Sequence, residues 1–263
     1  MATLMRGVVL FLALSACTEL APGSDTLDLT RANLMEAGSP LDPRWACLDE
    51  PPEASAVALG AQPTLTLVPV DIASGAPPEG LTARACQRLD VDCLTPVTSG
   101  VTLADDNALH LQVPRGFDGF VELTSPASVS TMYFVNQPML ADRVESFRLL
   151  NRPGLQALAT QGGVTLEPEL GHLLIRVFDC EGAAASGVQL SNDRGGEPFS
   201  FVNGLPSTGA DVTTADGLGG FVNVPPVLVV LQGLKVDDGR VISTPSVSVR
   251  SGWFTYGDVE PPR

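Results

Sequence analysis

Two stretches of this chain repeat nearly the same pattern, and the repeat constrains the fold more than any other feature. Residues 101–114 begin with VTLAD and reach a proline through alternating apolar residues. Residues 212–225 begin with VTTAD and reach a proline at the same spacing. Each copy is typical of a strand end, a tight acidic turn and a returning strand, which together form a hairpin. The sequence therefore predicts two related β-sandwich modules.

Turn chemistry supports both copies. In the second copy the turn contains Asp216-Gly217, where Asp can bond its own backbone and Gly can adopt the positive φ that a tight hairpin turn requires. In the first copy Asp106-Asn107 occupies the corresponding place, with weaker turn chemistry.

Composition points to the same class. The chain has 263 residues with 26 glycines, 22 prolines and only 5% aromatic residues, and helical periodicity is rare. Such a chain is long enough for two modest cores and is typical of all-β structure with many turns. The net charge of −15 argues against binding nucleic acid and against peripheral attachment to a membrane through anionic headgroups, because both would be repelled.

The N-terminus predicts export and a lipid anchor. Residues 7–16 are apolar but too short to span a bilayer. Residues 14–17, LSAC, resemble a bacterial lipobox, in which the thiol of Cys17 carries a diacylglycerol. The alternative is an ordinary secretory peptide cleaved after Ala16. Thr18, rather than Asp, follows the cysteine, which resembles the signal that sorts lipoproteins to the outer membrane. We therefore expect a lipid-anchored outer-membrane protein that faces the periplasm or the exterior.

The remaining cysteines predict disulfides. Cys47, Cys86, Cys93 and Cys180 are an even number in an oxidising compartment, and three pairings are possible. We favour Cys86–Cys93, because the segment between them is short enough to return on itself, which leaves Cys47–Cys180. A metal site is disfavoured, because there is no CxxC and no histidine at ligand spacing.

The pattern changes along the chain in a way that predicts its organisation. Apolar residues in 141–163 recur every three or four positions, which is typical of helix, and Pro153 after Asn151 suits the start of a second helix. The expected parts are a signal peptide (1–16), a flexible tether (17–44), a first β-sandwich (45–140), a helical linker (141–170) and a second β-sandwich (171–263).

The second module resembles a known family. Asp179, Glu181-Gly182, Gly187-Val188, residues 214–217 and residues 224–226 form a pattern similar to the regulatory-like domain of zinc carboxypeptidases. The resemblance implies tandem transthyretin-like or Ig-like sandwiches in a surface context, without catalytic residues. With the lipobox, the layout resembles lipoproteins common in myxobacteria.

Two departures weaken that resemblance. The glycine that usually follows the proline is replaced at Pro226-Val227, and the first module lacks the Asp-Gly pair.

Catalytic and metal chemistry find little support in the residues. The two histidines, His110 and His172, have no nucleophile nearby in sequence, and no GxSxG elbow occurs. The acidic turns at 90–92, 105–107 and 237–238 match no complete calcium loop, so turn formation explains them better. We expect no enzyme, cofactor or metal.

Two segments are candidates for recognition. Residues 192–209 form a long polar excursion containing Phe199, Phe201 and Asn203, and such loops are often functional. Trp253 and Tyr256 near the C-terminus could form an aromatic platform, although core packing explains aromatics better.

These observations predict non-catalytic modules for binding, adhesion or envelope organisation. The partner would be an envelope protein or a glycan, and addition of a peptide to a strand edge is one mode of binding. The alternative is a carbohydrate-binding module that accompanies an envelope or secreted hydrolase. An undetected hydrolase would need a pocket with convergent titratable groups.

Overall fold

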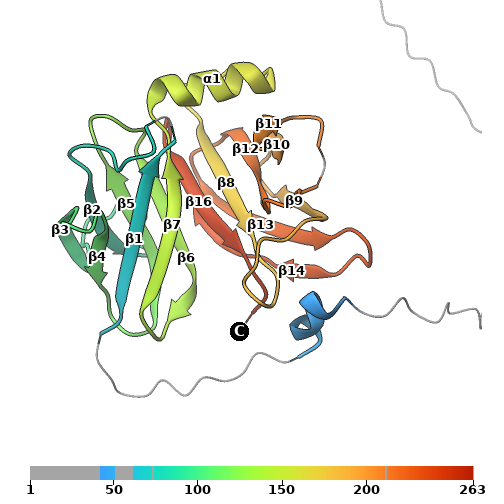
Figure 1. Ribbon diagram of the computed structural model, residues 1–263, viewed down its shortest axis with the longest axis horizontal. Helices are drawn as coiled ribbons and strands as arrows, with labels where there is room; N and C mark the ends of the chain where they lie inside the picture. Colours follow the sequence, from blue (N-terminus) through green and yellow to red (C-terminus); the bar gives the residue numbers. More distant parts are fainter. Residues whose placement is uncertain (1–41, 51–61, 73, 211, 263) are drawn as a thin grey trace, which may run out of the picture. The chain divides into compact units, whose positions relative to one another are not determined.

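The computed structural model describes residues 42–50, 62–72, 74–210 and 212–262, and these are mostly β-strands (Figure 1). The elements in chain order are η2 (Pro43–Asp49), a 3-10 helix, β1 (Thr64–Asp71), β2 (Thr82–Gln87), β3 (Thr98–Thr102), β4 (Leu109–Gln112), β5 (Phe117–Thr124), β6 (Thr131–Met139), β7 (Arg143–Leu149), α1 (Arg152–Gly162), β8 (Gly171–Val177), β9 (Val188–Asn192), β10 (Glu197–Val202), β11 (Leu205–Ser207), β12 (Leu218–Val224), β13 (Leu228–Lys235), β14 (Val241–Ser243), β15 (Ser246–Ser248) and β16 (Phe254–Val259).

The largest sheet, which we call the central sheet, has nine strands in the order β11-β10-β12-β8-β16-β6-β5-β2-β3. Its neighbours pair antiparallel, except that β16 runs parallel to both β8 and β6. Strands from both predicted modules therefore belong to one sheet, and the C-terminal strand β16 joins the two halves.

Two smaller sheets cover opposite faces of the central sheet. The β1 sheet has the order β4-β1-β7, and the β13 sheet consists of β13 paired with β14, β15 and β9. On β5, Phe120 packs in the same core as Leu231 of β13, whereas its neighbour Val121 packs in the same core as Leu65 of β1. Because successive side chains of a strand point to opposite faces, the two cores lie on opposite sides of the central sheet. We call them the β13-side core and the β1-side core.

The all-β sandwich class predicted from the sequence is confirmed. In the β1 sheet, β1 and β4 come from the first predicted module and β7 from the predicted linker, whereas all strands of the β13 sheet come from the second module. The two sandwiches share the central sheet, so strand pairing connects them as well as the chain itself. The described residues lie within one compact unit, Leu41–Arg263.

The helix predicted for the first part of the linker is wrong. Residues Arg143–Leu149 form strand β7, which pairs in parallel with β1 from Leu65 to Asp71. Phe147 and Leu149 are buried against the central sheet, whereas Val144 is 69% exposed. Spacing alone could not separate the two states, because what selects the strand is pairing with β1, which lies far away in the sequence.

The repeated stretches form turns, but these turns do not close hairpins. Asn107 donates its N–H to the Ala104 carbonyl (2.9 Å), and Gly217 donates to the Thr214 carbonyl (2.9 Å). Asn107 and Gly217 have positive φ angles of 63° and 60°. However, β3 belongs to the central sheet and β4 to the β1 sheet, and the second turn follows residues that hydrogen-bond to β9. Each turn therefore carries the chain from one layer to another.

Both favoured disulfides are present, Cys47–Cys180 and Cys86–Cys93. The first attaches η2 to the end of β8, where Cys47 donates its N–H to the Cys180 sulfur (3.2 Å). Beside it, Trp45 is only 2% exposed and packs in the β13-side core. The disulfide and the buried tryptophan together attach η2 to the second sandwich.

Candidate functional site

The β1-side face of the central sheet is wider than the β1 sheet that covers it. Beyond the edge strand β7, buried side chains of β8, β12 and β16 face the same core, namely Leu174, Val222, Phe254 and Tyr256. They line a cavity of about 720 Å³, whose other walls are β7, α1 and the β10–β11 hairpin. This volume is in the usual range for small-molecule sites. We call it the apolar cavity.

Helix α1 forms one wall of the apolar cavity. The Asn151 side chain caps its first turn, as predicted, and Gly163 ends it with a left-handed φ of 73°. Leu155, Leu158 and Ala159 line the cavity. Figure 1 shows α1 running across the ends of β7 and β8 towards β11. The helix therefore closes one side of the cavity, near these strand ends.

The β10–β11 hairpin forms a second wall, next to α1. The sequence reads this region as a polar excursion, but Ser200–Val202 pair with Leu205–Ser207, and β10 extends the central sheet. Asn203 and Gly204 both have positive φ, of 55° and 77°, and make the tight turn. Phe199 and Phe201 meet edge to face, with ring centroids 5.8 Å apart, and both line the cavity.

The third wall is the free edge of β7, and side chains from the central sheet occupy two of its carbonyls. Arg176 donates from Nη1 to the Ser146 carbonyl (3.3 Å), and the Tyr256 hydroxyl donates to the Arg148 carbonyl. Burial raises the pKa of Tyr256, against the lowering effect of the Arg176 and Arg148 charges, so the phenol remains a donor. A peptide strand added at this edge would have to displace both bonds.

The two arginines at this wall differ in their partners. Arg176 contacts Asp258 through Nε (2.7 Å) and Nη2 (2.8 Å), and it also reaches Glu145 (2.9 Å). Burial lowers the pKa of Arg176, but Asp258 outweighs it, so the net shift is upwards and the guanidinium stays charged. Arg148 is an exposed residue among those that line the cavity, and within the described residues its side chain has no hydrogen-bond or ion-pair partner. Asp216 is the cavity's acidic residue.

Four of the five residues singled out for recognition come together in this cavity. They are Phe199, Phe201, Asn203 and Tyr256. Trp253 lies elsewhere, packed against the β13-side core, with the Arg250 guanidinium 4.9 Å from its ring centroid. The contributions of β7, β8 and α1 were missed, because nothing local to those segments marks them as neighbours.

The histidines occupy different environments. His110 lies on the outer face of the β1 sheet, where its Nδ1 is 3.1 Å from the Thr66 hydroxyl and its Nε2 is 2.9 Å from Asp106. Successive hydrogen bonds thus connect the Thr66 hydroxyl, the His110 imidazole and the Asp106 carboxylate at the protein surface. None of these residues lines the apolar cavity. His172 is 3% exposed and packs on the ring of Phe254, with centroids 5.5 Å apart.

Burial lowers the pKa of His172 from 6.5 to about 4. The unfolded chain therefore binds an extra proton between these values, so stability is complete above pH 6.5 and falls as pH drops towards 4. We expect a loss of up to about 3 kcal/mol from this group. Urea unfolding at several pH values should show a shallower pH slope for His172→Gln. Equal slopes in the wild type and in His172→Gln would contradict the prediction.

The acidic turns are occupied by local partners. Asp90 accepts backbone hydrogen bonds from Leu94 (2.9 Å) and Thr95 (2.7 Å). Asp237 and Asp238 both pair with the Lys235 ammonium, at 2.7 and 2.9 Å. These contacts agree with the interpretation that the carboxylates shape turns.

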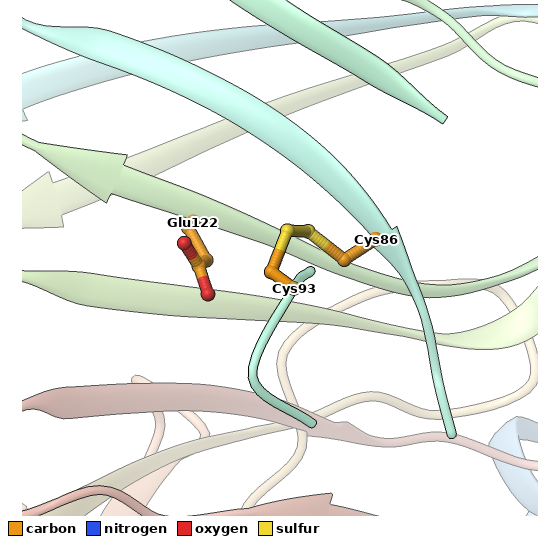
Figure 2. A group of neighbouring side chains, drawn as sticks. All are labelled: Cys86, Cys93 and Glu122. Carbon is orange, nitrogen blue, oxygen red and sulfur yellow. A yellow bond between two sulfur atoms is a disulfide. The ribbon is translucent and has the colours of Figure 1, made fainter. Parts of the chain in front are cut away.

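The Cys86–Cys93 disulfide lies beside Glu122, as Figure 2 shows. Both sulfurs are bonded to each other, so they offer no thiolate to a metal. The Glu122 carboxylate, 1% exposed, lies between Arg84 and Arg250, and the Arg250 contact measures 2.5 Å. The arrangement is a buried ion pair beside a disulfide.

The lipidation residue Cys17 and most of the expected tether lie outside the described residues. Within the described part of the chain, none of the helices is long and apolar enough to cross a membrane.

Comparisons with known proteins place this chain in no family. No family model matches it. No curated protein matches it either. The resemblance to the carboxypeptidase regulatory-like domain therefore stays a prediction.

Several solved structures are similar at low TM-score. The Bacillus anthracis TIE protein has 12% identity and a TM-score of 0.25. The match covers 76% of this chain and 34% of the TIE chain, so this chain spans about a third of the length of that protein. The D295N mutant of the shaft pilin spaA from Lactobacillus rhamnosus GG has 9% identity and a TM-score of 0.25. The match covers 78% of this chain and 100% of the pilin chain. GBS52, the minor pilin of Streptococcus agalactiae, has 12% identity and a TM-score of 0.25. The match covers 75% of this chain and 94% of the GBS52 chain.

Proposed function

We propose that this chain is a lipid-anchored, non-catalytic binding protein of the bacterial outer membrane, and that the apolar cavity is its ligand site. The observation that carries the proposal is the cavity itself. Apolar side chains of the central sheet, including its β10–β11 hairpin, line it together with those of β7 and α1. An apolar concave site with a few polar groups at its rim is the usual form of a small-molecule binding site.

The polar groups of the cavity support binding rather than catalysis. Of the described residues that line it, none is a histidine, a cysteine or a glutamate. The hydroxyls of Tyr256 and Thr208 donate to the carbonyls of Arg148 and Gly162, so neither is paired with a general base. Nucleophilic or acid–base chemistry needs such a pair.

The anchor is proposed from the lipobox at residues 14–17, and the two disulfides support an oxidising compartment. Several acyl chains together hold a protein firmly at a membrane, whereas one chain holds it weakly. Mass spectrometry of the mature N-terminus checks this part of the proposal. An unmodified Cys17 after cleavage would contradict it.

The binding site is tested by filling the cavity. Leu174 is 9% exposed and lines the apolar cavity, so Leu174→Trp places an indole in the space where a ligand would lie. We expect the neutral fluorescent probe N-phenyl-1-naphthylamine to bind the wild-type protein saturably. Leu174→Trp should weaken this binding by about tenfold or more, because apolar burial in the cavity supplies the affinity.

The matched control is Leu228→Trp, which makes the same change at a leucine that is 49% exposed on β13. It should bind the probe as the wild type does. Circular dichroism and thermal unfolding show whether both variants are folded. Probe binding that is absent, or equal in the two variants, would overturn the assignment of the cavity as the site.

The glycan alternative has less support. Phe254 and Tyr256 are 4% and 3% exposed, so they form no open platform for a sugar. Trp253 is half-buried, and Arg250 lies over its ring. Nothing at these aromatics favours a sugar over the packing that they already make.

A further inference from the structure

The charges around the apolar cavity are unequal at its two ends. The carboxylates of Asp258 and Glu145 neutralise Arg176. Asp216 lies near the same end, because it precedes β12 and the first residue of β12, Leu218, pairs with Arg176. Arg176 binds the carbonyl of Ser146 on β7. Arg148 follows two residues later on the same strand, so it lies closer to α1 than the Arg176 contact does. The end near Arg176 is thus acidic or balanced, whereas the end near Arg148 carries a positive charge.

Arg148 is held at the rim by its own backbone. Its carbonyl accepts the hydroxyl of Tyr256, which joins β7 to β16 and fixes the position of the residue. Its side chain is exposed and, within the described part of the protein, makes no hydrogen bond or ion pair. The charge still acts on Tyr256, inside the cavity, where it opposes the rise in the pKa of that phenol. An unpaired guanidinium next to an apolar space is suited to a carboxylate or a phosphate.

The walls determine what accompanies the anion. Between Arg148 and α1 they are aliphatic and aromatic, with Leu155, Leu158 and Phe199 among them. A peptide strand would need the carbonyls of β7, and two of these already accept bonds from Arg176 and Tyr256. A ligand without backbone donors and acceptors fits such a surface better, because it leaves no polar group unpaired.

We propose that the apolar cavity binds a single fatty acyl chain that ends in an anionic group, with the chain between β8, β16 and α1 and the anion at Arg148. This inference rests on the proposed function and specifies its ligand. The anion is a carboxylate if the ligand is a free fatty acid, and a phosphate if it is a lysophospholipid of the membrane. Both have one chain and one negative group.

The experiment uses displacement of N-phenyl-1-naphthylamine from the full-length protein. The competitors are oleate, its neutral methyl ester, and lysophosphatidylglycerol, each below its critical micelle concentration. Oleate or lysophosphatidylglycerol should displace the probe more strongly than methyl oleate. The one that binds more tightly identifies the source of the chain.

The variant Arg148→Gln keeps the length of the side chain and removes its charge. It should weaken binding of the anionic competitor by about tenfold, as expected for one charge-assisted hydrogen-bonded contact, and leave methyl oleate unchanged. The matched control is Arg152→Gln. Arg152 is exposed in the first turn of α1, four residues further along the chain, and does not line the cavity.

The outcomes separate the two proposals. If the probe binds and Leu174→Trp blocks it, but charged and neutral competitors act equally or none displaces it, the acyl-anion inference is overturned and the binding site stands. The inference is also overturned if Arg148→Gln and Arg152→Gln have the same effect. If Leu174→Trp leaves probe binding unchanged, the proposed function fails first.

Discussion

Removal of the Cys47–Cys180 disulfide, by alanine at both positions, is expected to lower the free energy of unfolding by about 5 kcal/mol. The two cysteines are 133 residues apart, so the bridge closes a long loop and removes much of the conformational freedom of the unfolded chain. It also holds η2 against the β13-side core, where Trp45 is 2% exposed. Urea unfolding under non-reducing conditions measures the loss.

The second disulfide is the matched control. Cys86 and Cys93 are separated by 7 residues, so the same loop-closure argument predicts a loss of about 2.5 kcal/mol for the double alanine variant. The ranking is the sharper prediction, because native-state strain affects each absolute value. A larger loss from the short bridge than from the long one would contradict the argument from loop length.

Replacing Asp258 by leucine is expected to cost about 4 kcal/mol, because it leaves a buried guanidinium without its main partner. The side chain of Asp258 is fully buried, and that of Arg176 is 13% exposed. Asp258 also accepts from the Tyr133 hydroxyl (3.3 Å), so the substitution leaves a second buried donor unpaired. Chemical denaturation at neutral pH measures the change.

The double variant Asp258→Leu/Arg176→Met tests the reason for this cost. It removes both charges and keeps apolar volume, so it should be more stable than the single variant Asp258→Leu. If the double variant is as unstable as the single one, the loss comes from packing at β8 and β16 and not from an unpaired charge.

Local signals in the sequence predicted several elements correctly. Asn151 and Pro153 mark the start of α1, where the Asn151 side chain caps the first turn. The preference for Cys86–Cys93 followed from the short distance between them, and the other pair then followed by exclusion. Each of these features depends on residues close together in the sequence.

The errors share a different origin. Residues Arg143–Leu149 have apolar spacing that fits a helix, yet they form β7, because β1 offers a parallel partner 78 residues earlier in the register Leu65↔Arg143. The excursion after β9 became the β10–β11 hairpin because β12 offered an edge for pairing. Non-local pairing overrides local periodicity in both cases.

The apolar cavity could be anticipated only in fragments. Phe199, Phe201, Asn203 and Tyr256 stood out because aromatic and turn residues are conspicuous in a chain with few of them. Arg148 did not stand out, because a single arginine in a strand has no distinguishing pattern. Its importance comes from its position at a cavity whose walls are formed by segments that are far apart in the sequence.

By itself the sequence determined the all-β class, the turns, the start of α1 and the more favoured disulfide pairing, since each depends on short-range chemistry or on composition. Only the tertiary structure decided that β16 pairs with both β6 and β8, so that two sandwiches share one sheet. The same pairing exposes a strip of the β1-side face, which α1 and the β10–β11 hairpin enclose as a cavity. The physical reason is that the order of the strands decides which part of a sheet face is covered by other elements and which part stays open. That order depends on contacts between segments that are far apart in the sequence.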